Sequence, residues 1–287
     1  MDEYRNNDNM TNYYNDDYNE VGENKSNNNR KKHKGGKYFF LSVLIVGFVV
    51  LCIGGIWIYK TDMTKYMDVK KVNETYSGDK ITDISIDYAA GLLVVEKSSN
   101  NDIHIMGDMV PSDVEFNVNN ISFTVKSQPN KWTNLPYIDD KCKLTIQLPE
   151  KVYKNVKLSL GAGQSNIDNI HCNKLDIDMG VGQTNITNIT SETYANISCG
   201  VGESNFNNCL FSTVNFDCGV GSLNFDGKIH GDANIDAGVG SCSFKLNDPE
   251  SDYFFSGDNS KHYGSSNGKY NIDLDKGVGD TTFRFSD

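Results

Sequence analysis

The chain has 287 residues, of which 38% are hydrophobic and 23% are charged, and its formal net charge is −11 at pH 7. The charge is uneven, because residues 61–287 carry 19 basic and 31 acidic side chains, a net charge of −12. An acidic segment of this kind argues against binding to nucleic acids or anionic lipid surfaces, and it is compatible with cations or basic ligands.

The N-terminal segment is polar and poor in aliphatic side chains. Residues 1–30 contain ten Asn and four Tyr together with scattered acidic residues. Such a composition cannot bury enough apolar surface to offset the entropy cost of ordering. It predicts a disordered, Asn-rich tail over residues 1–36, with phosphorylation of Tyr13 or Tyr14, or docking of a partner there, as the alternative.

A membrane-spanning helix is predicted next, over residues 37–60. The run 38–59 has 22 residues without a charge, about 33 Å as a helix, which is enough to cross a bilayer core of about 30 Å. Five basic residues lie within 30–37, whereas only Lys60 and Lys65 follow closely. This bias predicts a single-pass signal-anchor in the cell membrane, with the N-terminus in the cytoplasm and the C-terminal domain outside. Residues 61–79 are then a juxtamembrane linker.

A repeat follows. Gly-x-Gly recurs at intervals of 19, 20, 19, 19 and 39 residues, and the last interval, being two periods, predicts one degenerate copy within residues 256–270. A weaker first copy has Ala89 and Gly91 in the glycine positions. The first glycines of the clear copies are Gly161, Gly180, Gly200, Gly219, Gly238 and Gly277.

Apolar residues occur three and one residues before the first glycine and six residues after it, with polar residues between them. This period of two predicts a strand, a tight bend at the glycines and a second strand in every copy. Stacked copies would bury the inward rows as one core, so the sequence predicts an all-β domain over residues 80–287. Its fold is expected to be a single-stranded β-helix, or β-solenoid, with coils of about 19 residues.

Two further alternating stretches, 114–127 and 143–149, predict conventional strands that cap the N-terminal end of this domain. The loop between them contains Trp132 and Tyr137. These two aromatic side chains are the candidates for ligand contact by stacking, with ordinary packing of the loop as the alternative.

The repeats resemble a known family. The stretch "LTIQLPEKVYKNVKLSLGAGQSNIDNI", followed by "LDIDMGVGQTNITNI", is similar to the bacterial "putative adhesin" repeat domain, a domain of unknown function related to the toast-rack region of Lia-type cell-envelope stress proteins. The resemblance covers about residues 80–287. It implies a single-stranded β-helix beside a transmembrane segment, and it implies no catalytic residues.

The glycines do not predict a phosphate or calcium site. A phosphate loop requires a helix directly after the glycines, and calcium-binding nonapeptide repeats have a period of nine, whereas here a strand follows and the period is about 19. An acidic row two residues before the first glycine includes Asp217 and Asp236, the weak candidates for a bound Ca²⁺, with a solvated acidic face as the alternative. Asn residues five positions after the glycine predict a hydrogen-bonded ladder.

The cysteines and histidines predict no catalytic or zinc site. Cys199 and Cys218 share one repeat position and point inward, which favours a core role over a disulfide between them. We therefore expect a non-enzymatic, membrane-anchored extracellular module for adhesion or for binding and sensing in cell-envelope stress, with no cofactor and with a cell-wall polymer or envelope protein as its partner. The alternative is an enzyme that acts on cell-wall polysaccharide from a β-helix scaffold.

Overall fold

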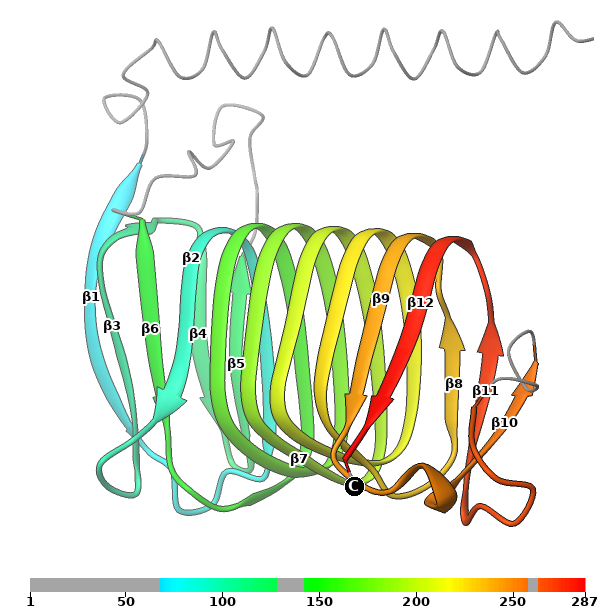
Figure 1. The fold of residues 1–287 in the computed structure, drawn as a ribbon. Coiled ribbons are helices and arrows are strands. Elements are labelled where there is room, and N and C mark those ends of the chain that lie inside the picture. Colours follow the sequence, from blue (N-terminus) through cyan, green and yellow to red (C-terminus); the bar gives the residue numbers. More distant parts are fainter. Residues whose placement is uncertain (1–67, 128–141, 258–262, 287) are drawn as a thin grey trace, which may run out of the picture. The chain divides into compact units, whose positions relative to one another are not determined.

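The computed structural model describes residues 68–127, 142–257 and 263–286, which lie in one compact unit, Asp62–Asp287. Strands dominate this unit and join into one twelve-stranded sheet that coils around a single core (Figure 1). A short 3-10 helix, η3 (Glu250–Asp252), lies near the C-terminal end. The strands are β1 (Val69–Ser77), β2 (Asp83–Lys97), β3 (Asp102–Pro111), β4 (Val114–Asn119), β5 (Ser122–Ser127), β6 (Lys143–Leu148), β7 (Val152–Ile229), β8 (Ala233–Asp236), β9 (Val239–Leu246), β10 (Tyr253–Gly257), β11 (Tyr270–Asp275) and β12 (Val278–Phe285).

Successive coils are parallel and in register. Ile86 on β2 lies opposite Leu158 on β7, and Val214 near the end of β7 lies opposite Ala233 on β8, 19 residues further along the chain. β7 extends over 78 residues because the chain remains paired with its neighbours through four glycine corners. The predicted repeat is therefore confirmed as an all-β, solenoid-like fold.

The three predicted inward rows form the core. Every member is buried except Lys276, which replaces an apolar residue in the last coil. Aromatic side chains fill the core in the later coils, where the ring centroids of Phe206, Phe216, Phe225 and Phe244 lie 5.5–6.4 Å apart. The buried members of the rows are Ile86, Leu158, Ile177, Ile197, Phe216, Ile235 and Leu274; Tyr88, Leu160, Met179, Cys199, Cys218 and Ala237; and Val95, Ile167, Ile186, Phe206, Phe225, Phe244 and Phe283.

Antiparallel strands close the N-terminal end. β5 and β6 pair in parallel with the two halves of β2, and β4 and β3 pair antiparallel with β5 and β6 respectively. β1 pairs antiparallel with β3 at the edge of the sheet. The predicted cap is confirmed as part of the same sheet.

The domain begins earlier than the sequence predicted. β1 lies within residues 61–79, the segment expected to be a linker, and its Val72 is buried in the core. Lys71 and Glu74 are exposed, and Glu74 interrupts the apolar alternation between Val72 and Tyr76, so the apolar pattern is too sparse to distinguish this edge strand from a linker.

The C-terminal end contradicts the prediction of a degenerate coil between the last two Gly-x-Gly motifs. Val278 pairs directly with Val239 although 39 residues separate them, and β11 pairs directly with β8. β10, which comes earlier in the chain, lies on the far side of β11 (Figure 1). Tyr263 then packs on Phe255 and Phe283, with centroid distances of 5.7 and 5.3 Å. The extra residues therefore cap the core and add no coil.

Several predicted features lie outside the described residues. These are the tail over residues 1–36, the transmembrane helix over residues 37–60 and the loop that contains Trp132 and Tyr137. Within residues 68–127, 142–257 and 263–286, no helix is long and apolar enough to cross a membrane.

Candidate functional site

The Gly-x-Gly motifs form corners at which the backbones of neighbouring coils come very close. A Cβ atom built on Gly202 would lie 1.9 Å from the carbonyl oxygen of Gly182. The second glycine of each motif from Gly163 to Gly279 also has a φ angle between +132° and +141°. Only glycine satisfies both conditions without strain, so the motif makes a corner and is not a phosphate loop.

The middle residue of the motif is exposed and apolar in five successive corners. β-sheet pairing places these side chains one above the next, roughly 4.8 Å apart. We call this row the valine ridge. Its members are Val181, Val201, Val220, Val239 and Val278, which are 58%, 51%, 51%, 49% and 73% exposed.

An acidic row runs parallel to the valine ridge, three residues earlier in each copy. Asp236 is the Cα partner of both Asp217 and Asp275, and all three side chains are exposed. Because the 39-residue interval adds no coil, these aspartates occupy three adjacent strands. At a spacing of roughly 4.8 Å, each neighbouring pair repels by about 1 kcal/mol in water, so the row favours a positively charged partner.

The predicted calcium ligands are neighbours, as the repeat required. Asp217 and Asp236 border an open hollow of about 640 Å³ together with Asn215, Asn234 and Gly257. The Asp236 carboxylate also accepts a hydrogen bond from the backbone N–H of Gly238, at 3.2 Å. Among the residues that the structure describes, no group of three or more His, Cys, Asp or Glu side chains is placed to hold a metal ion.

Asparagine ladders stiffen the outer faces on both sides of the corner. The predicted row is confirmed, since the amide of each Asn donates to the one on the preceding coil: Asn185 to Asn166, Asn205 to Asn185 and Asn224 to Asn205, at 3.0, 3.1 and 2.9 Å. A second ladder joins Asn234 to Asn215 at 2.9 Å, beside the acidic row. Both rows hold the exposed surface at a fixed spacing.

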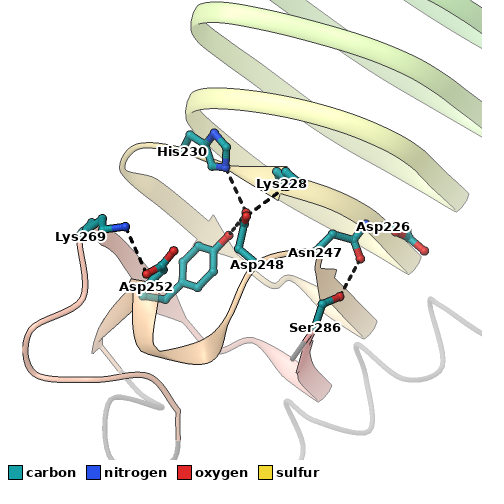
Figure 2. A network of polar contacts seen from close by, with 9 residues as sticks. Asp226, Lys228, His230, Asn247, Asp248, Asp252, Lys269 and Ser286 are labelled. Atoms are coloured by element: carbon teal, nitrogen blue, oxygen red, sulfur yellow. Dashed lines mark hydrogen bonds and ion pairs between the residues drawn. The ribbon is translucent and has the colours of Figure 1, made fainter.

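A further polar cluster, which we call the Asp248 cluster, joins the C-terminal cap to the last coils (Figure 2). The side chain of Asp248 is only 14% exposed and accepts hydrogen bonds from Lys228, His230 and Tyr253, at 3.2, 3.1 and 3.2 Å. Burial alone would raise the pKa of Asp248, but the donors Lys228 and His230 outweigh it and hold the pKa below its ordinary value. The His230 ring also stacks on Tyr270, with 5.3 Å between centroids. These contacts fasten β10 and β11 to the end of β7.

The predicted ligand-contact residues Trp132 and Tyr137 lie outside the described residues, but the residues that flank their loop lie beside the first corner. Its two described neighbours are Ser127, whose hydroxyl accepts a hydrogen bond from the Ala89 N–H at 3.1 Å, and Cys142, whose carbonyl accepts one from the Leu92 N–H at 3.0 Å. Ser127 and Cys142 therefore lie beside the corner that corresponds to the valine ridge in later coils.

Comparison with known proteins identifies the family. The sequence profile for the N-terminal domain of toast_rack (DUF2154) matches residues 61–207, slightly more than half of the chain. The chain belongs to the toast-rack family. This membership confirms the resemblance expected from the repeats, and the coils after residue 207 continue beyond the matched part of the toast-rack domain.

The toast-rack domain also resembles solved structures of low sequence identity. A "putative adhesin" from Bacteroides fragilis is 17% identical, with a TM-score of 0.39, and the alignment covers 76% of this chain and 97% of that one. A "putative cell adhesion protein" from Clostridium sporogenes is 15% identical, with a TM-score of 0.35 and coverages of 76% and 100%. A "putative adhesin" from Parabacteroides merdae is 17% identical, with a TM-score of 0.31 and coverages of 77% and 98%. Among curated proteins, none matches the toast-rack chain in sequence.

Sequence reasoning missed three features. The valine ridge was visible as the repeated middle residue of the motif. A buried row of small polar residues lies four positions after the first glycine: Ser165, Thr184 and Ser204. Alternation along the strand puts these side chains on the same inward face as the apolar row six positions after the glycine. The Asp248 cluster had no sequence signal, because its members come from separate elements that break the repeat.

Proposed function

We propose that this toast-rack protein is a membrane-anchored, non-enzymatic binding module on the outer side of the cell membrane, serving in adhesion or in the sensing of cell-envelope stress. Its binding surface is the glycine corner, where the acidic row and the valine ridge run side by side. A cell-wall polymer or an envelope protein that presents cationic and apolar groups at a regular spacing is the partner that fits this surface.

One observation carries the proposal: the same pair of exposed features recurs at strand spacing on adjacent coils. Asp217, Asp236 and Asp275 form one line, and the neighbouring valines of the same corners form the other. Pairing, glycine corners and asparagine ladders all fix this spacing before a partner arrives. A rigid surface loses little conformational entropy on binding, which favours affinity for a partner with a matching repeat.

Membrane attachment rests on the uncharged run 38–59 and the basic residues before it. The acidic domain would be repelled by anionic lipid headgroups, so its surface would remain available to partners beyond the bilayer.

The test measures co-sedimentation of the purified domain, residues 62–287, with isolated cell envelopes. The hydrophobic core formed by the described residues lies within this segment, so the domain contains what it needs to fold on its own. Replacing Asp217, Asp236 and Asp275 by Asn is expected to weaken binding at least about tenfold if each carboxylate contributes about 0.5 kcal/mol or more. The control replaces Asp79, Asp102 and Asp113 by Asn, which changes the net charge equally, and it is expected to bind like the wild type.

The rival function is separated by the same preparations. An enzyme acting on cell-wall polysaccharide would release soluble sugars from the envelopes, and Asp217→Asn would abolish the release. If the wild-type protein releases sugars and Asp217→Asn does not, the proposal of binding without catalysis is overturned. If the two triple variants co-sediment equally with the envelopes, the acidic row is not part of the binding surface.

A further inference from the structure

Three cysteines lie together beneath successive glycine corners. Cys199 and Cys218 precede the first glycine on neighbouring coils, and Cys242 follows Gly238 by four residues on the next coil. Their side chains are buried, with exposures of 9%, 6% and 3%. All three line one cavity of about 30 Å³ at the corners, whose wall also includes Val201, Val220 and Val239 of the valine ridge.

The stacking of the corners places Cys199 and Cys218 side by side. A Cβ atom built on Gly219 would lie 2.2 Å from the carbonyl oxygen of Gly200 and 2.4 Å from that of Cys199, which puts one coil directly on the other. In-register strands hold their Cα atoms roughly 4.8 Å apart, and this lies within the range of about 4.4–6.8 Å that a disulfide requires.

Cys242 reaches the same cavity from the opposite wall of the corner. Its sulfur lies 3.6 Å from the carbonyl oxygen of Ala237. Ala237 occupies the repeat position of Cys218 on the next coil, and its small side chain leaves room for the third thiol. The thiol of Cys218 interacts with the thiols of both Cys199 and Cys242, and all three side chains face the same cavity. The thiol cluster is thus a chain with Cys218 at its centre.

The contacts divide the roles of the three sulfurs. Hydrogen bonding with Cys218 lowers the pKa of Cys199 and of Cys242, while the same two contacts raise the pKa of Cys218. In either disulfide through Cys218 one outer cysteine stays free, and its thiolate is the nucleophile that can attack Cys218 in thiol–disulfide exchange.

We propose that Cys218 is the shared partner of two mutually exclusive disulfides, Cys199–Cys218 and Cys218–Cys242, which form by exchange with a small disulfide oxidant. The oxidant's S–S bond breaks, one S–S bond forms in the protein, and the two protons lost by the cysteines leave on the two thiols of the reduced oxidant. In the Cys199–Cys218 disulfide, the Cys242 thiolate can attack Cys218 and release Cys199 as a thiolate. The Cys199 thiolate can attack the Cys218–Cys242 disulfide in the same way. This exchange moves the bond with no net oxidation.

Either disulfide would staple neighbouring coils beneath the corner that carries the acidic row. Cys199–Cys218 would join two strands on one wall, and Cys218–Cys242 would join the two walls across the corner. The oxidised protein would therefore hold the spacing of its outer rows more tightly than the reduced one. This inference does not depend on what the outer surface binds.

The test uses the full-length chain, purified in detergent, fully reduced and then incubated with oxidised glutathione. Remaining thiols are blocked with N-ethylmaleimide, and the protein is digested without reduction and analysed by mass spectrometry. We expect peptides linked through Cys199–Cys218 and through Cys218–Cys242, with the cluster losing two hydrogens per molecule. Failure of the wild type to form either link, or arrest at a mixed disulfide with glutathione, would overturn the proposal.

Variants assign the central role. Cys199→Ala is expected to retain only the Cys218–Cys242 link, Cys242→Ala only the Cys199–Cys218 link, and Cys218→Ala neither. Cys209→Ala is the matched control, because Cys209 is buried in the core but does not line the cavity, and it is expected to retain both. A Cys199–Cys242 link in Cys218→Ala would contradict the shared-partner arrangement, and circular dichroism confirms that each variant keeps its β structure.

Discussion

Replacing Gly202 by Ala tests whether the close approach at the corners holds the coils together. The new Cβ atom would lie 1.9 Å from the Gly182 carbonyl oxygen, whereas such a contact needs about 3.3 Å. The two coils must therefore separate locally by about 1.4 Å, which breaks roughly two ladder hydrogen bonds at about 1 kcal/mol each. The φ angle of +139° at this position adds about 1–3 kcal/mol of backbone strain. Together these terms predict a loss of about 3–5 kcal/mol.

The assay is equilibrium urea unfolding of residues 62–287, followed by far-UV circular dichroism. Val201→Ala is the matched control on the same corner, because Val201 is 51% exposed, and its free energy of unfolding is expected to stay within about 0.5 kcal/mol of the wild type. A Gly202→Ala protein within about 1 kcal/mol of the wild type would refute the argument that these glycines are required by backbone contact.

Two other predictions concern the polar contacts. Asn205→Ala breaks the ladder on both sides of Asn205, so it is expected to lower the free energy of unfolding in urea by about 1–2 kcal/mol. Replacing the exposed Asn207 by Ala is the control and should change this free energy little. Equal stabilities of the two variants would show that the ladder contributes nothing. Asp248→Asn is expected to cost about 1–2 kcal/mol at pH 7, since it removes the charge that accepts the bonds from Lys228 and His230. Because the folded pKa of Asp248 is lowered, its contribution is present above the unfolded value of about 3.9 and is lost as the pH falls through the folded pKa. The difference in unfolding free energy between Asp248→Asn and the wild type should therefore shrink as the pH falls. A difference that stays constant from pH 7 to pH 3 would contradict this account. So would a difference equal to that of Asp178→Asn, the control at an exposed aspartate.

The repeat and its inward rows could be predicted because they depend on local periodicity. Each coil uses the same alternation, so aligning copies on the first glycine assigns Ile177 and Phe225 to the core and Asp217 and Asn205 to the outer faces. The acidic row follows from the same parity. Burial of the rows and the hydrogen-bonded Asn ladder confirm this reasoning.

The C-terminal end could not be predicted in this way. Counting periods treats the 39 residues between Gly238 and Gly277 as two coils, but strand order depends on pairing between distant residues. Phe255 on β10 has the pattern of an ordinary core strand, yet β11 lies between β10 and β8. The partners of Asp248 come from the end of β7, the residue directly after it and β10, so no spacing in the sequence brings them together.

The account depends most on the unbroken rows at the corner, because a coil inserted between Gly238 and Gly277 would separate Asp236 from Asp275 and Val239 from Val278. The direct measurement is cross-linking of the double variant Val239→Cys, Val278→Cys with dibromobimane, which fluoresces when it bridges two nearby thiols, with the bridged peptides identified by mass spectrometry. The account predicts bridging as efficient as in Val220→Cys, Val239→Cys, whose residues are also Cα partners. Bridging no better than in Val220→Cys, Val278→Cys, where two strand spacings intervene, would contradict it.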